Sequence, residues 1–364
     1  MAARTASARG MIETHLTAVG FDLVSAEDIR TVLSAMLDAL DKAENPLVSV
    51  KEFGAVGNGV ADDTVAIQAA LNEGAWKTIF FPVGSYKITS TLTVPNAQNI
   101  RLLGGGRHNT IIHMFGNGNI LTMTNPNHCA LEELVFLRGS GTGNGVVFSG
   151  QNGSNGIDHC AFEGNTGYGL AFTASQAVPQ SSNRVTRCRF LSNTLEQLYM
   201  FWSNDSTIAF NTYGGGTGPY ATAACFLNNS SAGQYISNEH WNNTIALKLT
   251  SSNFLRIANN RFEESRQEGV LATTCLYCQF NGNYLHTNSQ SSSGTYSALR
   301  LSGSTSWNIT GNTFMSWNAL RHKHSIEVDG TSGTINMVGN MMAHNTGANI
   351  NTSTATNVNS TGNM

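Results

Sequence analysis

The sequence has little charge and no excess of either sign. Aspartate, glutamate, lysine and arginine make up 12% of its 364 residues, about half of the share in an ordinary globular domain. With 20 basic and 23 acidic residues the formal net charge is −3, so the chain lacks the basic stripe that neutralises nucleic-acid phosphates. We therefore expect no nucleic-acid partner.

Long apolar runs are absent and cysteines are few. No segment offers 18 consecutive apolar residues, and no apolar run of signal-peptide length follows Arg4 and Arg9. We expect no membrane partner and no secretion signal. Six cysteines are too few for a disulfide framework at this length, and Cys275-x-x-Cys278 has no second pair. We expect reduced core residues without metal or cofactor, a metal or redox role being the alternative.

What the sequence does contain is glycine and apolar residues in short stretches. Glycine reaches 37 residues, hydrophobic residues make up 40% of the chain, and much of the remainder is Asn, Ser and Thr. This composition suits short strands joined by tight turns and predicts an all-β fold.

Residues 25–45 carry the one strong helical pattern. The apolar residues that recur at steps of three and four are Ile29, Val32, Leu33, Met36, Leu37 and Leu40, and Pro46 ends the pattern. Because an isolated helix of this length is unstable in water, its apolar stripe must pack on the same chain or on copies of itself. We favour self-association through residues 1–46.

A repeat begins near residue 129. An aliphatic or large apolar residue is followed five positions later by a second one, usually with Asn or Cys two before it. The first members are Leu131, Ile157, Val185, Ile208, Ile236, Ile257, Phe280, Ile309 and Met337. The second members are Phe136, Phe162, Phe190, Tyr213, Trp241, Phe262, Leu285, Phe314 and Met342.

The separation of five predicts a turn between the two members, because a flat strand alternates its faces with period two. Asn211, Asn260, Asn283, Asn312 and Asn340 occupy this turn, where Asn tolerates a left-handed backbone. Stacked turns would join these amides in a ladder. This register places Trp241 in the core and Glu239 in the slot that Asn fills elsewhere.

The stretch between Val48 and His113 carries a long motif. It reads EFGAVGNG from Glu52, then DDT from Asp62, IQAA from Ile67 and FPxGxY from Phe81. The motif resembles the pectate-lyase-like module at the start of many phage tailspikes and bacterial polysaccharide-degrading enzymes. The resemblance implies a right-handed parallel β-helix over residues 47–348 with a capping helix near residues 62–71. Residues 349–364 form a tail, either a last coil or disordered.

Within that class, the absence of a signal and the amphipathic segment make the chain similar to a small phage tailspike. This resemblance implies a homotrimer on the virion tail, joined to the tail, baseplate or an adaptor protein through residues 1–46. It also implies binding, and often cleavage, of capsule or O-antigen polysaccharide at the host surface. A non-catalytic receptor-binding spike is the alternative that the sequence leaves open.

Hydrolysis of a glycosidic bond requires two carboxyl groups about 5 to 9 Å apart, one protonated and one ionised. Our candidate catalytic residues are Glu263, Glu239, Asp205 and Glu264, which lie on successive coils and should come within reach of each other. A turn role for Glu239 is the alternative interpretation.

Aligning the coils turns Tyr199, Lys248 and Arg300 outward in one row, with Glu327 close by. Together with Trp202 and Arg266 they are our candidate substrate-binding residues, fitting an acidic glycan. The alternative is a solvated strip whose ion pairs contribute under about 1 kcal/mol each.

β-Elimination is the rival chemistry, since a base and a cation can act on a uronate. The residues available for it are Arg256, Arg261, Arg266, Lys248 and His240. A calcium-assisted lyase is disfavoured because no cluster of neighbouring aspartates is present.

Overall fold

The computed structural model describes residues 27, 30–34, 36, 47–151, 153–215, 222–317, 320–330, 332–352 and 356–364. The chain divides into two compact units, Met1–Val48 and Ser49–Met364. In the first unit residues 27, 30–34 and 36 are helical, in agreement with the pattern of residues 25–45. The remainder of that predicted helix, and most of the 1–46 segment, lies outside the described residues.

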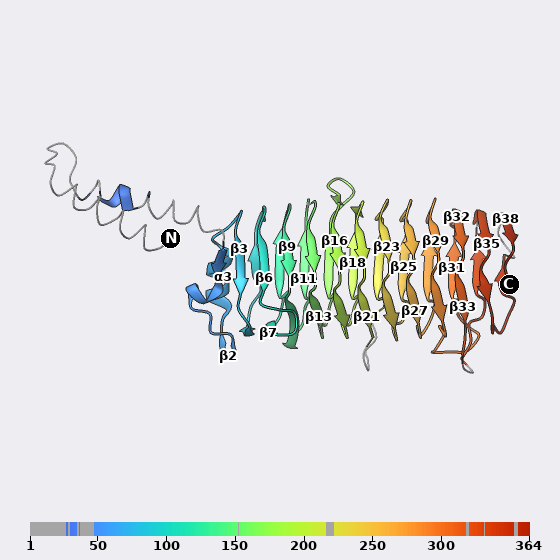
Figure 1. The fold of residues 1–364 in the computed structure, drawn as a ribbon, viewed down its shortest axis with the longest axis horizontal. Coiled ribbons are helices and arrows are strands. Elements are labelled where there is room, and N and C mark those ends of the chain that lie inside the picture. Colours follow the sequence, from blue (N-terminus) through green and yellow to red (C-terminus); the bar gives the residue numbers. More distant parts are fainter. Residues whose placement is uncertain are drawn as a thin grey trace. The chain divides into compact units, whose positions relative to one another are not determined.

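The second unit is a parallel β-helix built from three long sheets (Figure 1). Sheet A holds β1 (Leu47–Ser49), β3 (Thr78–Phe81), β6 (Arg101–Gly104), β9 (Ala130–Glu132), β12 (Gly156–Asp158), β16 (Arg184–Thr186), β20 (Thr207–Ala209), β23 (Gln234–Ile236), β26 (Arg256–Ala258), β29 (Gln279–Asn281), β32 (Thr305–Thr310), β35 (Gly333–Val338) and β38 (Thr356–Thr361). Sheet B holds β2 (Asn58–Asp62), β4 (Gly84–Ile88), β7 (Thr110–Phe115), β10 (Val135–Ser140), β13 (Ala161–Glu163), β17 (Arg189–Leu191), β21 (Thr212–Gly214), β24 (Glu239–Trp241), β27 (Arg261–Glu263), β30 (Tyr284–His286), β33 (Thr313–Met315) and β36 (Met341–Met342).

Sheet C holds β5 (Leu92–Val94), β8 (Leu121–Thr124), β11 (Val146–Ser149), β14 (Leu170–Thr173), β18 (Leu198–Phe201), β22 (Cys225–Asn228), β25 (Leu247–Thr250), β28 (Val270–Thr273), β31 (Leu299–Ser302), β34 (Ile326–Asp329) and β37 (Ile350–Asn351). The short strands β15 (Gln180–Ser181) and β19 (Ser203–Asn204) pair separately. Each coil therefore runs through sheets A, B and C in turn, and its strands pair with those of the coils before and after it. The predicted β-helix is confirmed.

Rings stacked along the rod fill the core beneath sheet B. Phe136, Phe162, Phe190 and Tyr213 follow one another with centroids 4.9 to 5.4 Å apart, as the spacing of paired strands requires. Eight of the nine predicted coils have the expected inward pair. The coil of β23 and β24 differs by one residue. Its inward residues are Tyr235 and His240, so the prediction of Ile236 and Trp241 for this coil is wrong.

A ladder of asparagine amides, all buried except the half-buried Asn363, runs along the turn from sheet A to sheet B. Its members are Asn211, Asn238, Asn260, Asn283, Asn312, Asn340 and Asn363. Each Nδ2 donates to the Oδ1 of the next coil at 2.9 to 3.1 Å. The predicted ladder is therefore present. The left-handed residue, however, is the one before each amide, such as Asn259 with φ 57°.

Two short helices close the first coil. The 3-10 helix η1 (Val50–Phe53) and the α-helix α3 (Thr64–Leu71) form the predicted cap, and Ile67, Ala70 and Leu71 are buried. The carboxylate of Asp63 accepts hydrogen bonds from the backbone N–H groups of Val56 and Gly57, which holds the cap loop. Among the helices of the described residues, none is long and apolar enough to cross a membrane.

The other sequence predictions for the body concern its cysteines and its end. All six cysteines are buried and free, as expected for core residues. Strands β37 and β38 pair with β34 and β35. The described part of residues 349–364 is thus the last coil of the solenoid, one of the two alternatives for that segment.

Candidate functional site

The outer face of sheet B carries carboxylates and aromatic rings on three neighbouring strands, β24, β27 and β30. The middle residue of each strand points into the core, so the first and third residues face outward. The strand register places Arg261 between Glu239 and Tyr284. We call the outward residues of these three strands, together with Trp317, the sheet B cluster.

The one-residue shift at His240 creates this arrangement. With His240 inside, Glu239 and Trp241 both project outward, and the third residues of the strands place Glu263 between Trp241 and His286. Glu239 is therefore not in the turn, because Asn238 fills the ladder slot. Trp241 is 37% exposed and is not the core residue that we predicted.

The electrostatics centre on Glu263. Nη2 of Arg261 lies 2.7 Å from its Oε1, and Nε of the same arginine donates to this oxygen at 3.0 Å. Nδ1 of His286 is 3.9 Å away on the next strand. Burial lowers the pKa of His286, so the imidazole is neutral at pH 7 and can accept a proton. Burial and the Glu263 charge raise the pKa of Tyr284.

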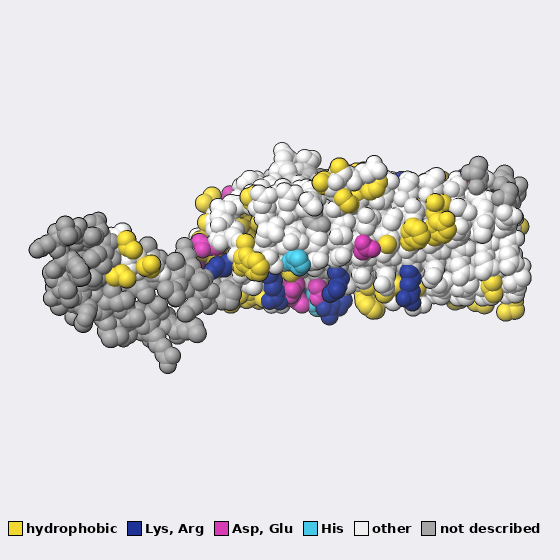
Figure 2. Space-filling model, turned by 90° about the horizontal axis from the view of Figure 1, so that it is seen from above, with side chains coloured by type: hydrophobic (Ala, Val, Ile, Leu, Met, Phe, Trp, Pro, Cys, Tyr) yellow, Lys and Arg dark blue, Asp and Glu magenta, His cyan; other side chains and the backbone are white. Residues whose placement is uncertain are grey.

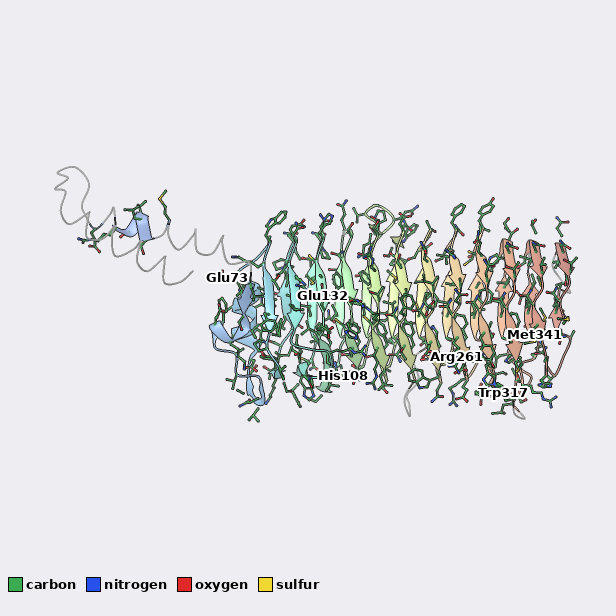
Figure 3. All side chains as sticks on the ribbon, viewed as in Figure 1. Glu73, His108, Glu132, Arg261, Trp317 and Met341 are labelled. Carbon is green, nitrogen blue, oxygen red and sulfur yellow. The ribbon has the colours of Figure 1, made fainter. Side chains whose placement is uncertain are left out.

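Aromatic rings flank these charges. Trp317 is 69% exposed and lies edge-on against His286, with centroids 4.9 Å apart. Its side of the rod is the one that carries Arg261 (Figure 3). Trp241 lies over Gly214, where a Cβ would come within 2.6 Å of the indole. Glycine at this position therefore lets the ring lie close to the sheet.

The two outward carboxylates belong to neighbouring strands of one face. Glu239 and Glu263 lie on paired strands, two residues apart along them, so their Cα atoms are about 8 Å apart. Glycoside hydrolysis uses carboxyl groups separated by roughly 5 to 9.5 Å, a range that side chains on Cα atoms about 8 Å apart can reach. The cluster thus combines a carboxylate pair, a guanidinium and flat apolar rings on an open face.

The other two predicted catalytic residues lie differently. Glu264 occupies the left-handed turn directly after β27, with φ 51°, and its N–H donates to the carbonyl of His286 at 3.0 Å. Asp205 is an exposed turn residue between the short strand β19 and strand β20 of sheet A. A strand of sheet A separates it from Glu239, so the prediction that the two come within reach of each other is wrong.

Three of the five predicted substrate-binding residues, Tyr199, Lys248 and Arg300, lie on sheet C. Its outward row runs Tyr199, Phe226, Lys248, Leu271, Arg300 and Glu327, while Met200, Leu249 and Leu301 point inward, as we predicted. Tyr199 stacks on Tyr168 at 4.8 Å, and the Lys248 ammonium lies 4.5 Å from the Phe226 ring. Trp202 follows β18, and Arg266 lies in the turn between β27 and β28. The predicted catalytic and binding residues therefore lie on sheets B and C and in the turns between strands, not on one face.

Glu268, in the turn before β28, and Glu327, on β34, are two further carboxyl groups beside sheet C that were not among the predicted catalytic residues. Glu268 is buried, burial raises its pKa, and its Oε1 lies 3.8 Å from Nη1 of Arg300. Glu327 accepts a hydrogen bond from Ser297 at 2.7 Å and lies 3.4 Å from the ammonium of Lys323. In the sequence, the signal for Glu268 was its position two residues before the inward Val270.

The sheet B cluster also contains Tyr284 and His286, which the sequence did not identify as site members, and Trp317, which the sequence offered only as one of several tryptophans able to stack on sugars. The signal for the first two was their position on either side of the inward Leu285. Among the described residues, no group of three or more His, Cys, Asp or Glu side chains is arranged to hold a metal ion.

Comparison with known proteins adds family information. Residues 47–269, more than half of the chain, match the family model described as "Rhamnogalacturonase A/epimerase, pectate lyase-like". Mannuronan C5-epimerase AlgE1 of Azotobacter vinelandii is 37% identical over 76 residues, which are 18% of this chain and 5% of the relative. A capsule-specific depolymerase of Klebsiella phage K5-2 is 38% identical over 91 residues, 24% of this chain and 11% of the relative.

The pre-neck appendage protein of Bacillus phage phi29 is 31% identical over 105 residues, 28% of this chain and 12% of the relative. All these alignments thus span a small part of the relatives' lengths.

Solved structures share the fold at low sequence identity. The Dettilon tailspike protein superimposes with a TM-score of 0.69 at 13% identity, covering 87% of this chain and 68% of that one. The N-terminal fragment of bacteriophage Phi29 gene product 12 gives 0.71 at 14% identity, covering 85% and 60%. The A-module of Azotobacter vinelandii epimerase AlgE6 gives 0.63 at 17% identity, covering 87% and 98%.

Proposed function

The chain belongs to the rhamnogalacturonase A/epimerase, pectate lyase-like family, and from this premise we propose that it is a phage tailspike that cleaves bacterial surface polysaccharide. The single observation that carries the proposal is the pair of outward carboxylates, Glu239 and Glu263, beside exposed indole rings. A Klebsiella phage depolymerase and phage tail structures among the similar proteins support the phage and capsule parts.

We assign the reaction to glycoside hydrolysis. Glu263, which forms the ion pair with Arg261, supplies the ionised carboxylate as nucleophile or base, and Glu239 supplies the acid that protonates the leaving oxygen. Trp241 and Trp317 offer apolar faces on which pyranose rings can stack. Tyr199, Trp202, Lys248, Arg266 and Arg300 are proposed to bind more distant parts of an acidic chain along sheet C.

β-Elimination is the second candidate chemistry, and one observation favours it. The neutral His286 lies beside Arg261 and Glu263, so a base and a cation stand together on this face. His240 is excluded from this role because it is buried in the core, and Arg256 faces outward from sheet A instead. A spike that only adheres remains the non-catalytic alternative.

The first test is incubation of the full chain with capsule and lipopolysaccharide from candidate hosts, following reducing ends and the absorbance of unsaturated uronates together. New reducing ends without absorbance are expected. Glu239→Gln and Glu263→Gln should each lower the rate by roughly 100-fold or more, since each removes an acid–base or nucleophilic group. The matched control Glu132→Gln removes an ion pair with Arg101 on sheet A and should leave the rate unchanged.

Each contrary outcome has its own meaning. Added absorbance would replace hydrolysis by elimination and transfer the assignment to Arg261 and His286. Loss of activity in Glu268→Gln, with Glu239→Gln unaffected, would transfer it to the pair on sheet C. Binding of polysaccharide without either signal would leave an adhesive spike and overturn the enzyme.

We further propose that the protein acts as a homotrimer at the virion tail, attached to the tail, baseplate or an adaptor protein through residues 1–46. The phage appendage and tailspike relatives support this placement. In this arrangement the tail would bring the protein to its polysaccharide substrate on the host cell surface.

A further inference from the structure

The edge at which each coil passes from sheet C to sheet A has a repeated backbone geometry. Several coils have two left-handed residues at this edge, and the one nearer to sheet A recurs in every coil with φ between 51° and 60°. These residues are Asn99, His128, Ser154, Ser182, Asp205, Ala232, Phe254, Tyr277, Ser306, Thr334 and Asn357. We call this surface the C–A edge.

Phe254 and Tyr277 depart from the pattern of the C–A edge. The left-handed region is unfavourable for bulky side chains, and most other members are small or polar. Both rings are nonetheless exposed, at 61% and 56%, and gain little burial in return. They stack in parallel, with centroids 5.1 Å apart and planes at 10°. Phe210 is equally exposed and left-handed on another turn, so what distinguishes Phe254 and Tyr277 is that they stack on neighbouring coils and form one continuous apolar face.

The surroundings of this pair are hydroxyls and amides. Oγ of Ser251 lies 3.0 Å from Oγ1 of Thr274, and Asn253 accepts a hydrogen bond from the N–H of Leu276 at 2.8 Å. Asn253 in turn donates its N–H to Ser231 at 3.1 Å. These hydroxyl and amide neighbours are uncharged, and Figure 2 shows much of this side of the rod as uncharged surface broken by separate hydrophobic patches, with Lys and Arg side chains along one margin.

The same chemistry continues toward the N-terminal end of the C–A edge. A shallow hollow of about 580 Å³ is lined by amides, hydroxyls and glycine, including Gln98, Asn127, Gln151, Ser154 and Ser181. Ser154 and Phe254 belong to coils four steps apart, about 19 Å at the strand spacing. Asp205 is the charged residue of the edge between them.

We propose that the C–A edge is a second glycan-binding site, which holds a neutral sugar chain by stacking its rings on Phe254 and Tyr277. Pyranose rings present apolar C–H faces to aromatic rings and hydroxyls to amides, which matches both parts of this surface. Arg256, the exposed first residue of β26, lies two residues after Phe254 and is the nearest cation along the chain. Stacking on the two rings requires no charge, so a neutral chain is the proposed ligand and uronate oligosaccharides are the comparison. The occupant is a glycan and not a second copy of the chain, since two rings offer far less than the roughly 600 Å² per partner of a stable interface.

The test measures binding of the full chain in a Glu263→Gln background, which keeps the sheet B cluster from consuming the ligand. The probe is an array of neutral hexose and N-acetylhexosamine oligosaccharides beside uronate-containing ones. The double variant Phe254→Ser with Tyr277→Ser should raise the Kd for a neutral glycan about tenfold. Serine is compatible with the fold, because it occupies the same left-handed turn at Ser154, Ser182 and Ser306.

Phe210→Ser is the matched control. This ring is equally exposed, at 61%, and left-handed, with φ 58°, but it lies on the turn from sheet A to sheet B. Its loss should leave the Kd unchanged. The proposal is overturned if no neutral glycan binds, or if the double variant binds as tightly as the control.

Sedimentation of the double variant tests whether Phe254 and Tyr277 instead form a contact between subunits. A change in its oligomeric state would make the pair a subunit contact and would also overturn the proposal. Cleavage by Glu239 and Glu263 is scored in its own assay, so either proposal can fail without the other.

Discussion

At the scale of single residues, His240 replaces a ring of the aromatic core stack. It stacks on Tyr213 with centroids 4.5 Å apart, and its Nε2 lies 2.5 Å from the Tyr235 hydroxyl. Burial lowers the pKa of His240 to about 3, and burial also lowers the pKa of His322 to about 3. Both imidazoles are therefore neutral in the folded protein well above pH 3.

This burial makes stability depend on pH in one direction. Below about 6.5 the unfolded chain takes up a proton on each histidine that the folded chain does not bind, so the free energy of unfolding decreases as pH falls toward 3. Above pH 6.5 the two histidines do not change the free energy of unfolding with pH, because they are neutral in both states. Each should contribute about 1.4 kcal/mol per pH unit at most.

We expect His240→Phe to remove about half of the slope that these two residues produce between pH 6 and pH 4. This pH dependence of the free energy of unfolding is measured by guanidinium unfolding at several pH values, monitored by tryptophan fluorescence. His128→Phe, which changes an exposed histidine, is the control and should leave the slope as in the wild type. An unchanged slope in His240→Phe would mean that His240 does not remain neutral.

At the scale of elements, the asparagine ladder fixes the turn between sheets A and B. Asn260 donates to the carbonyl of Tyr235 at 2.9 Å and to Asn283 at 3.0 Å, and accepts from the N–H of Asn238 at 2.9 Å. All of these groups are buried, so an unpaired one costs about 1 to 3 kcal/mol.

We expect Asn260→Ala to lower the free energy of unfolding by about 3 kcal/mol, since it leaves a buried carbonyl and N–H groups without partners. The midpoint of guanidinium unfolding measures this loss. Asn308→Ala is the control, because Asn308 joins a ladder of exposed amides with Asn336 and should cost under about 0.5 kcal/mol. Equal losses in the two variants would show that the buried ladder contributes nothing special.

The coil of β23 and β24 explains what the sequence could and could not predict. The rule of five residues, with Asn two before the second, fits Tyr235, Asn238 and His240 as well as it fits every other ladder coil. We predicted Ile236 and Trp241 as the inward pair because both are more apolar than Tyr235 and His240. Because strand register has a period of two, this slip of one residue exchanged the inner and outer faces and hid Trp241 from the predicted site.

At the scale of the whole molecule, the sequence predicted the solenoid, its cap and its outward rows, because each depends on a pattern that recurs in every coil. The location of a site depends instead on which corner of the coil a residue occupies. Asp205 and Glu239 follow each other by one coil, yet one lies on the C–A edge and the other on sheet B. Trp317 follows β33 outside the repeat, so no period could place it against His286.

Assembly is the remaining property at this scale, and it depends on residues 1–46. Val32 and Met36, two members of the apolar stripe, are exposed. A stripe of this kind needs a partner, and packing against the same stripe on other copies would supply one. The cap of the β-helix, with η1 and α3, lies after residue 46 and would remain intact without that segment.

We therefore expect deletion of residues 1–46 to convert a trimer into a monomer, with the thermal unfolding midpoint of the β-helix changed by no more than a few degrees. Sedimentation equilibrium of the full and shortened chains measures the mass, and circular dichroism measures the midpoint. A shortened chain that stays trimeric would place the subunit contacts on the β-helix, where they would compete with glycan for sheets B and C. A full chain that is monomeric at micromolar concentration would contradict the trimer itself.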